Sequence, residues 1–299
     1  MFSRLKDSQV VRNKYGYYEL AQKPTKEELK KYYSEKYYQE ANGGYQQEYS
    51  ADEVAYFKNK TEQKYQVIKK IFFSSDRACK SLLDVGSGEG WALRFFKEKG
   101  WKIAGVDFSE FGCKKFNPDC LGYVRAGEDL YDNLRSLVNT KAVFDVIWLD
   151  NVLEHVVDPL SLLQLCRKLV SDGGVLVVEV PNDFSLIQEY ALEKGYIEKE
   201  SWVALPDHLS YFNKDGLVAL AKDAQWKCEK VMGDFPIDFN LINSSANYIA
   251  DPTKGKACHR ARVEIENVLH RISVDKTIAL YQALADLGLG RQIIGFFVC

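Results

Sequence analysis

The sequence lacks the features that mark secreted and membrane-spanning proteins. Its seven cysteines are scattered and include no C-x-x-C pair, which argues against a disulfide framework and against a thiolate zinc site. No apolar run is long enough to span a membrane, and the N-terminal residues MFSRLKDSQVVRNK are too polar for a signal sequence. We therefore expect a cytoplasmic protein with reduced cysteines.

The chain also lacks a strong charge of either sign. Its 299 residues carry a formal net charge of -2, which gives no global attraction to nucleic acid or to an anionic membrane. We expect neither of them as a partner. The length suits one large α/β domain with additions, or two modest domains.

A glycine-rich turn is the most informative feature that is present. In SLLDVGSGEGWAL, an apolar run ends at Val85, glycine follows at positions 86, 88 and 90, and a helical pattern begins. This order predicts a strand, a tight loop and a helix. Glycine permits positive φ angles and close approach of the backbone to a ligand, and the first N–H groups of the helix are free to meet an anion. The turn is therefore the predicted cofactor site.

The glycine spacing decides between two cofactor classes. The dinucleotide fingerprint G-x-G-x-x-G needs a third glycine where the chain has Trp91. The pattern present, D-x-G-x-G-x-G beginning at Asp84, resembles motif I of the class I S-adenosylmethionine-dependent methyltransferases. An acid suits that cofactor, which carries an ammonium group and a positive sulfonium. The resemblance assigns the cofactor to Asp84, Gly86, Ser87, Gly88 and Gly90. The alternative is a glycine turn without a ligand.

A second acidic strand end supports this interpretation. Residues 102–107 read as a strand that ends in Asp107, 23 residues after Asp84. In dinucleotide folds an acid at the tip of the neighbouring strand accepts hydrogen bonds from the ribose hydroxyls. The sequence VDFSE also resembles the second methyltransferase motif, in which Phe108 would flank the adenine. The alternative for Asp107 is a helix N-cap or a solvated strand end.

Two more strand ends complete the predicted cofactor site. Gly127 and Glu128 follow a plausible third strand, where members of the resembled family contact the adenine amino group. Residues 143–149 are a nearly continuous apolar run, typical of a strand buried on both faces. This run leads to Asp150 and Asn151, which we also assign to the cofactor.

The remaining pattern predicts an α/β fold. Strands and helices alternate through the centre of the chain, Asp158-Pro159 predicts a helix start, and Gly173-Gly174 predicts the turn before a fifth strand. We expect a Rossmann-like, seven-stranded methyltransferase sheet in the order 3-2-1-4-5-7-6, with the last strand antiparallel. The expected organisation is an N-terminal helical cap or lid (1–75), a cofactor-binding core (76–235), a helical substrate-side insertion (236–290) and a final core strand (291–299).

The N-terminal 75 residues are rich in tyrosine and have no strand pattern of the α/β kind. Thr25 is a good helix start, and residues 52–72 predict a second helix. Most of the tyrosines are expected to pack amphipathically with their hydroxyls toward water. Those between Tyr37 and Tyr49 are candidates to close over the cofactor or substrate, as an N-terminal lid does in related methyltransferases.

A longer resemblance indicates the activity. The segment FDVI…VLEHVVDP, the Gly-Gly turn and the following valine-rich strand resemble methyltransferases of small molecules and sugars, and with motif I they cover residues 80–182 in order. This implies O-methylation of a small anionic or sugar-containing acceptor, such as a nucleotide-linked sugar or a surface-polysaccharide precursor. The alternatives are C- or N-methylation, a metal-assisted RNA 2′-O-methyltransferase, a non-catalytic S-adenosylmethionine-binding protein and a nicotinamide-dependent oxidoreductase.

Methyl transfer to an alcohol requires removal of a proton, for which histidine is suited. Of the four histidines we favour His208, which lies beyond the fifth strand at the rim where open α/β sheets bind ligands, and then His155. The alternative for each is a structural histidine bonded to the backbone or, for His208, to Asp207.

The same residues raise the question of a metal. Glu154, His155 and His208 resemble part of the E-x-x-E-H plus distant histidine set of small-RNA 2′-O-methyltransferases, and carboxylate with imidazole suits a divalent ion. The position three before Glu154 is Asn151, so one anionic ligand is missing. From the sequence alone we expect no metal and no RNA partner.

Candidate acceptor contacts come from the C-terminal half. Arginine can bind phosphate or carboxylate in bidentate fashion, although each arginine can equally be a solvated charge on a helix face. The predicted acceptor-binding residues are Asn182, Tyr211, Arg260, Arg262 and Arg291.

Overall fold

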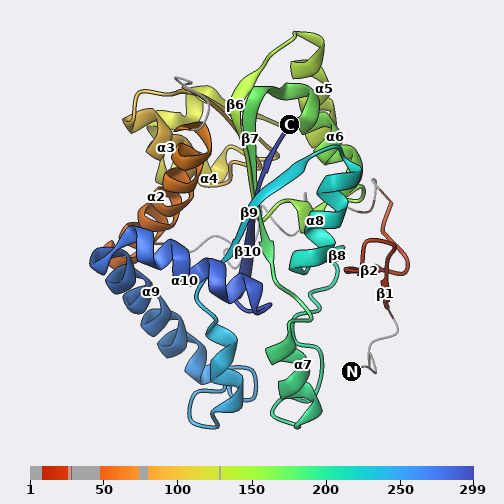
Figure 1. Cartoon of the computed structure of the whole chain (residues 1–299), viewed down its shortest axis with the longest axis vertical. Helices are drawn as coiled ribbons and strands as arrows, with labels where there is room; N and C mark the ends of the chain where they lie inside the picture. The colour runs from red at the N-terminus through yellow and green to blue at the C-terminus, as the bar shows by residue number, and fades with distance from the viewer. Residues whose placement is uncertain (1–8, 26–27, 29–47, 74–79, 128) are drawn as a thin grey trace.

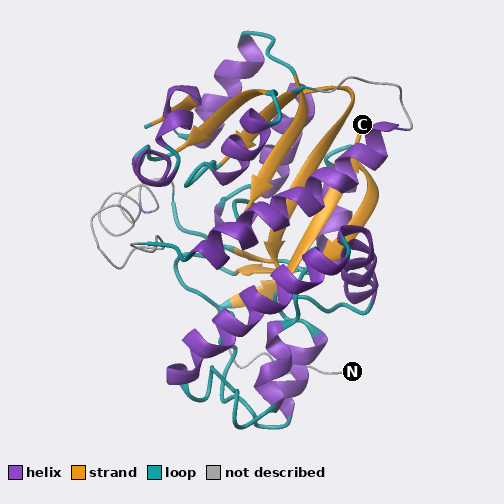
Figure 2. Ribbon diagram, turned by 90° about the vertical axis from the view of Figure 1, so that its left-hand side faces the viewer, coloured by secondary structure: helices purple, strands orange, loops and turns teal. Residues whose placement is uncertain are grey.

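A seven-stranded sheet forms the centre of the molecule, with helices on both faces (Figures 1 and 2). The computed structural model describes residues 9–25, 28, 48–73, 80–127 and 129–299. The strand order is β5-β4-β3-β6-β7-β10-β9, which confirms the predicted order 3-2-1-4-5-7-6. The strands are β3 (Ser81–Val85), β4 (Lys102–Asp107), β5 (Val124–Ala126), β6 (Phe144–Asp150), β7 (Val170–Pro181), β9 (Lys227–Gly233) and β10 (Gln292–Val298).

The strand directions determine which edge of the sheet is suited to bind a ligand. Strands β5, β4, β3, β6 and β7 pair in parallel, whereas β10 is antiparallel to both β7 and β9, as predicted for the last strand. The carboxyl ends of the five parallel strands therefore lie along one edge of the sheet. Ligands of open α/β sheets bind at this edge.

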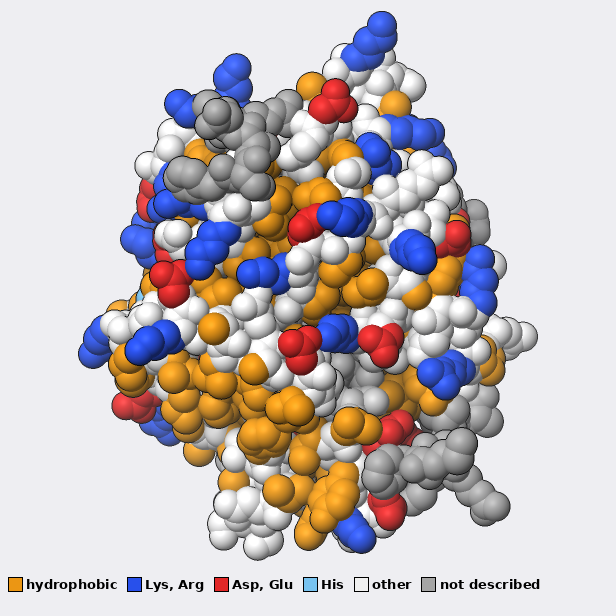
Figure 3. All heavy atoms as spheres, in the orientation of Figure 1, with side chains coloured by type: hydrophobic (Ala, Val, Ile, Leu, Met, Phe, Trp, Pro, Cys, Tyr) orange, Lys and Arg blue, Asp and Glu red, His pale blue; other side chains and the backbone are white. Residues whose placement is uncertain are grey.

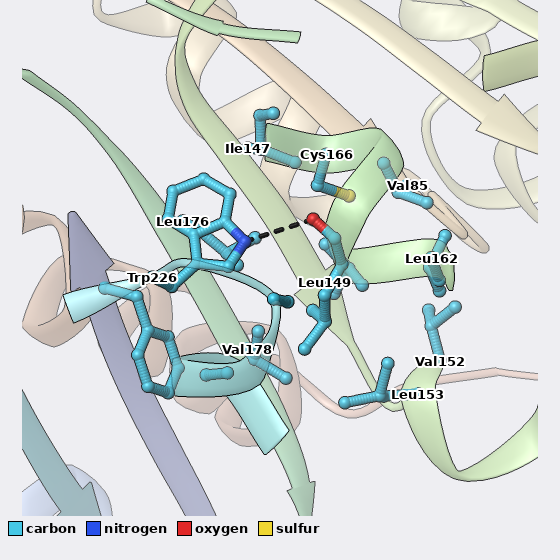
Figure 4. Packing of buried hydrophobic residues seen from close by; sticks show 14 of the residues in the cluster. Val85, Ile147, Leu149, Val152, Leu153, Leu162, Cys166, Leu176, Val178 and Trp226 are labelled. Carbon is cyan, nitrogen blue, oxygen red and sulfur yellow. Dashed lines mark hydrogen bonds between the residues drawn. The ribbon is translucent and has the colours of Figure 1, made fainter. Parts of the chain in front are cut away.

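Strands β6 and β7 are buried on both faces. In β7, Leu176 and Val178 point into one core cluster, while Val175 and Val177 point into the other. This alternation follows from the two-residue period of a strand. On the first face Trp226 packs beside Leu176 and Val178, and its Nε1 donates a hydrogen bond to the Leu163 carbonyl at 3.1 Å (Figure 4).

Each face is covered by helices whose apolar sides meet the sheet. One face packs against α5 (Leu130–Asn139), α6 (Pro159–Leu169) and α8 (Lys214–Asp223). The other packs against α2 (Ala51–Phe73), α3 (Trp91–Glu98) and α10 (Val274–Asp286). The predicted start of α6 is confirmed, because Ser161 N donates to the Asp158 side chain at 3.0 Å. The other helices are α4 (Phe111–Phe116), α7 (Leu186–Glu193) and α9 (Gly255–Ile272).

The insertion before β10 is helical, as predicted. It contains α9 and α10, and α9 packs along α2. Apolar side chains gather over α9 on the face seen in Figure 3, where Ile265, Val268 and Ile272 are exposed. In the described part of the chain, no helix combines the length and apolar character needed to cross a membrane.

The N-terminal region differs from the expected purely helical cap. Strands β1 (Val10–Arg12) and β2 (Tyr18–Leu20) form a small antiparallel sheet with β8 (Ser210–Tyr211). Two strands of three residues are too short for a clear pattern, and β2 pairs with a partner nearly 200 positions away, so no local pattern predicted them. The helix expected after Thr25 lies largely outside the described residues, although Thr25 N donates to the Glu28 carboxylate at 2.8 Å, as in a capping box.

The expected Gly-Gly turn before the fifth strand is wrong. Strand β7 begins directly after α6, and the two glycines lie within it. A Cβ on Gly174 would lie 2.8 Å from the Asp145 carbonyl oxygen, beside a register shift between β6 and β7. Glycine is needed here for close approach of two backbones.

Candidate active site

Three carboxylates lie at the ends of three adjacent strands. Asp84 of β3 is 3% exposed, Asp107 ends β4 and Asp150 ends β6. Asp107 also holds the glycine turn, because Gly88 N donates to its Oδ2 at 2.7 Å and Ser109 N donates to its Oδ1 at 3.0 Å. The structure thus brings together the acids that the sequence predicted for the cofactor.

The glycine turn leaves open space at the edge. Gly86 has a φ of 74°, and a Cβ there would lie 2.4 Å from Val152 Cγ2. Gly88 has a φ of 50°, and the nearest atom to its Cβ position is 4.0 Å away. In addition, the buried Ser87 Oγ has no hydrogen-bond partner among the described residues. The turn therefore has space for a ligand beside Gly88 and a polar group, Ser87 Oγ, to bind it.

The charge at this edge favours a positive ligand. Burial, and then the charges of Asp150 and Asp107, raise the pKa of Asp84 well above its ordinary value. Burial also raises the pKa of Asp107. Asp84 is buried beside two more acids, of which Asp150 is paired with Lys64, and an ammonium or sulfonium group would supply further counter-charge.

One counter-charge comes from a residue that the sequence did not single out. Lys64 of α2 is buried, and its Nζ lies 2.6 Å from Asp150 Oδ1 and also pairs with Glu179 of β7. Lys60, one turn earlier, places its Nζ 2.8 Å from Glu179 Oε1. These ion pairs fix α2 against the carboxyl edge. Their only local sign is two lysines spaced i, i+4 in an otherwise amphipathic helix.

The other predicted cofactor residues lie along the same edge. Phe108 follows β4, and its side chain is 44% exposed. Gly127 follows β5 with a φ of 90°, and Asn151 follows β6 with a φ of 53°. Glu128 lies outside the described residues. Asn151 N donates to the Glu179 carbonyl at 2.9 Å, which continues the pairing of β6 with β7 by one residue.

A second cluster lies next along this edge and consists of Glu154, His155 and His208. Their ligand atoms all lie within 4.8 Å of one another. The rings of the two histidines are 4.8 Å apart between centroids. His155 Nδ1 is 2.8 Å from the Asp207 carbonyl oxygen, and its Nε2 is 3.8 Å from Glu154 Oε1. The two histidines favoured by the sequence are thus brought together.

The cluster is buried and poorly satisfied. Glu154 is 1% exposed, and neither of its carboxylate oxygens has a hydrogen-bond partner in the described ranges. Burial, assisted by the charges of Asp183, Glu179 and Asp150, raises the pKa of Glu154 well above its ordinary value. Burial lowers the pKa of His208 to about 3. His208 is therefore neutral at physiological pH, and it is a weaker proton acceptor than the sequence suggested.

Three predicted acceptor contacts have their polar groups engaged within the fold. Asn182 Nδ2 donates to the carbonyls of Gly288 and Gly290 at 3.1 and 3.0 Å. The Tyr211 hydroxyl donates to the His208 carbonyl at 2.9 Å. Arg262 pairs with two buried carboxylates and with the Tyr56 hydroxyl. The hydrogen-bond donors of these side chains already bind other groups of the protein, so we assign them a structural role.

The other two predicted arginines differ in their position. Arg260 is exposed on α9. Arg291 is partly buried at the start of β10, where its Nη1 lies 2.9 Å from Asp183 Oδ1, and its charge contributes to the low pKa of His208. Burial raises the pKa of Asp183 to about 6, and Asp183 Oδ2 has no hydrogen-bond partner in the part of the chain that the structure describes. Of the three arginines predicted to bind the acceptor, Arg291 is therefore the one that lies beside the histidines.

Surface hollows lie elsewhere on the molecule. One of about 530 Å³ lies between α8 and β9 and is lined by Lys214, Val218 and Cys228 among others. It includes none of the acids or histidines described above. We place the site at the carboxyl edge, because the chemically reactive groups converge there.

Comparison with known proteins agrees with this geometry. A family of methyltransferase domains matches residues 51–231, more than half of the chain. The ubiquinone biosynthesis O-methyltransferase of Colwellia psychrerythraea (strain 34H) is 26% identical over 171 residues, covering 55% of this chain and 66% of that protein. The enzyme of the same name from Histophilus somni (strain 2336) is 28% identical over 187 residues, covering 57% and 76%. The chain thus spans about two thirds to three quarters of the length of these relatives.

The crystal structure of a SAM-dependent methyltransferase from Archaeoglobus fulgidus superimposes with a TM-score of 0.47 and 20% sequence identity, covering 79% of this chain and 93% of that one.

Proposed function

The chain belongs to the family of methyltransferase domains and is a class I S-adenosylmethionine-dependent enzyme, and from this premise we propose that it methylates a hydroxyl oxygen of a small acceptor. One observation carries the proposal. The acids around the glycine turn lie on the same sheet edge as a buried cluster that contains two histidines. The proposed cofactor site and the proposed site of proton transfer are therefore adjacent.

The residues around the turn fit the cofactor. When bound, S-adenosylmethionine supplies a methyl group on a positive sulfur that an acceptor atom displaces in line. Asp107 would accept hydrogen bonds from the ribose hydroxyls, and Asp84 would face the ammonium group. The open space at Gly88 would admit the ligand against the backbone.

The histidine cluster is the proposed place of the acceptor hydroxyl. The sequence predicted His208, and then His155, as the base for that oxygen, and we propose that both rings face it. His208 stays neutral because burial lowers its pKa to about 3, so it directs the hydroxyl rather than taking its proton. Asp183 is the better proton acceptor, since its pKa of about 6 lies near the working range of a general base.

The nature of the acceptor is the narrower part of the proposal. Arg291 beside the cluster supports an acceptor with a phosphate or carboxylate, such as a sugar nucleotide. A second candidate is an intermediate of ubiquinone biosynthesis, favoured by the similarity of the chain to two ubiquinone biosynthesis O-methyltransferases. Both relatives are O-methyltransferases, which favours O-methylation over C- or N-methylation.

The N-terminal region is proposed to cover the cofactor. Tyr49 donates its hydroxyl to Glu89 Oε1 at 2.8 Å, and its ring contacts Trp91 at 6.0 Å between centroids. Both partners adjoin the glycine turn. Tyr49 is thereby held beside the cofactor loop, whereas the other tyrosines from Tyr37 to Tyr45 lie outside the described residues.

Transfer of a labelled methyl group tests the proposed function. The protein is incubated with methyl-labelled S-adenosylmethionine and a panel of sugar nucleotides and quinone precursors. We expect labelled product with one acceptor class, and a kcat about a hundredfold lower for His208→Ala. The matched control His270→Ala, outside the cluster, should retain activity. Equal rates for His208→Ala and the wild-type protein would contradict the catalytic role of the cluster.

A further inference from the structure

Helix α9 of the insertion contacts the rest of the molecule along one side. Val263 on this side is buried, and Asn267 Nδ2 donates a hydrogen bond to the Asp52 carbonyl of α2 at 2.9 Å. These contacts hold α9 against α2 and leave the opposite side of the helix toward solvent. Polar and charged residues are typical of the solvent side of a surface helix.

The solvent side of α9 carries an apolar stripe instead. Ile265 and Val268 are each 41% exposed, Ile272 is 72% exposed, and Ala261 is also exposed. From Ala261 onward these four residues are spaced by four, three and four positions, which is the 3.5-residue repeat of a helix that packs along a second helix. Apolar side chains gather over α9 on the face seen in Figure 3. An exposed apolar surface of this kind indicates an interaction site.

The charges beside the stripe indicate which partner it fits. Glu264 and Arg271 are exposed, and their separation of seven positions places them on the same flank of the stripe. In a parallel pair of α9 helices each of them would face its own copy, and like charges would repel. In an antiparallel pair that crosses near Val268, Glu264 of each copy would face Arg271 of the other. Ile265 would then face Ile272, so both the charges and the apolar stripe are complementary to themselves.

We propose that this face of α9 binds a second copy of the chain across a two-fold axis near Val268, with the two α9 helices antiparallel. A two-fold dimer uses the same patch on both copies, as a self-complementary patch requires. A stable interface typically involves roughly 20 to 30 residues a side, so the contact extends beyond the stripe. It reaches the adjoining helix α10, where Leu280 is 42% exposed.

Sedimentation equilibrium of the full-length protein tests the dimer. We expect twice the mass of a single chain at high concentration and reversible dissociation on dilution. Val268→Asp places two carboxylates together in the apolar contact and should raise the dissociation constant by about tenfold or more. The matched control Val143→Asp changes another exposed valine, before β6, and should leave the dissociation constant unchanged. A wild-type protein that stays monomeric, or a dimer that Val268→Asp leaves intact, would overturn the proposal.

Exchange of the flanking charges tests the antiparallel arrangement. Glu264→Arg and Arg271→Glu each place like charges opposite one another in the proposed dimer, so each should weaken it at low ionic strength. The double variant restores opposite charges and should recover most of the wild-type affinity. Single variants without effect, or a double variant that stays as weak as the single ones, would overturn this arrangement.

Further measurements separate the dimer from misfolding and from another occupant of the face. Thermal unfolding and circular dichroism verify that each variant is folded. Flotation with phosphatidylglycerol vesicles tests a lipid surface as the alternative partner, and we expect no flotation of the wild-type dimer. A monomeric wild-type protein that floats with the vesicles, and loses this binding in Val268→Asp, would assign the face to a lipid surface and overturn the dimer.

Discussion

At the residue scale, Asp84 is a position where function opposes stability. Burial and two neighbouring acids raise its pKa, so its ionised form is unfavourable in the folded protein. We predict that Asp84→Asn raises the melting temperature by about 2 °C or more. The same substitution should weaken binding of S-adenosylhomocysteine at least tenfold, because the ligand ammonium loses its counter-charge.

The pH dependence of this effect has a definite sign. Since the pKa of Asp84 is raised by folding, the unfolded chain ionises it first, and stability is lost as the pH rises toward the folded pKa. The gain in melting temperature from Asp84→Asn should therefore grow with pH. Thermal unfolding of both proteins across a pH series checks this prediction. A gain that is constant or shrinks at higher pH would contradict it.

Two glycines of the turn should respond differently to alanine. A Cβ on Gly86 collides with Val152, so Gly86→Ala should lower the free energy of unfolding by about 2 kcal/mol. Gly88→Ala meets open space and should cost only about 1 kcal/mol from its positive φ, yet it should weaken cofactor binding more than it weakens the fold. Urea unfolding and calorimetry with S-adenosylhomocysteine measure the two effects. Equal stability losses would contradict the packing argument.

Sequence reasoning found some residues of the site and missed others for a physical reason. Asp84 and Asp107 are visible because strand, turn and acid follow one another in the chain. Lys64 gains its importance only from contacts with distant elements. Asp183 lies two positions after β7, so the argument from acids at strand ends could have found it. Arg262 was predicted to bind the acceptor, but it pairs with Asp234 and Glu266. Tertiary packing alone brings these buried partners to it.

At the element scale, helix α2 is attached to the sheet by charge as well as by apolar packing. Lys64 lies between Asp150 and Glu179 at the carboxyl edge. Lys64→Met would leave both acids without this partner in a buried place, and we predict a loss of roughly 3 kcal/mol in the free energy of unfolding. Lys70→Met, on the exposed end of the same helix, is the matched control and should change stability by less than about 1 kcal/mol. Similar losses in both variants by urea unfolding would refute the role of the buried pair.

Elements that follow a long local pattern were predicted, and short ones were not. The predicted helix over residues 52–72 corresponds to α2, because its apolar period extends over several turns. The three-residue strands β1 and β2 depend on pairing with each other and with β8. The glycines in β7 were read as a turn because their true cause, the approach of the Asp145 carbonyl, comes from a neighbouring strand.

At the scale of the whole molecule, the sheet order depends on more than local sequence, because the crossover through α5 carries the chain from β5 at the edge past β4 and β3 to β6. The final antiparallel strand brings Arg291 to the carboxyl edge, although it lies more than 100 residues after the end of β7. The fold therefore assembles its site from segments across most of the described chain. Placement of those segments depends on the sheet rather than on any single motif.

The central claim is that this edge binds S-adenosylmethionine through Asp107. Calorimetric titration with S-adenosylhomocysteine, comparing the wild-type protein with Asp107→Asn, tests it most directly, and thermal unfolding verifies that the variant is folded. We predict one ligand per wild-type chain and an affinity at least tenfold lower for the variant, because the ribose hydroxyls lose an ionised acceptor. No binding by the wild-type protein, or equal affinity in a folded variant, would contradict the claim.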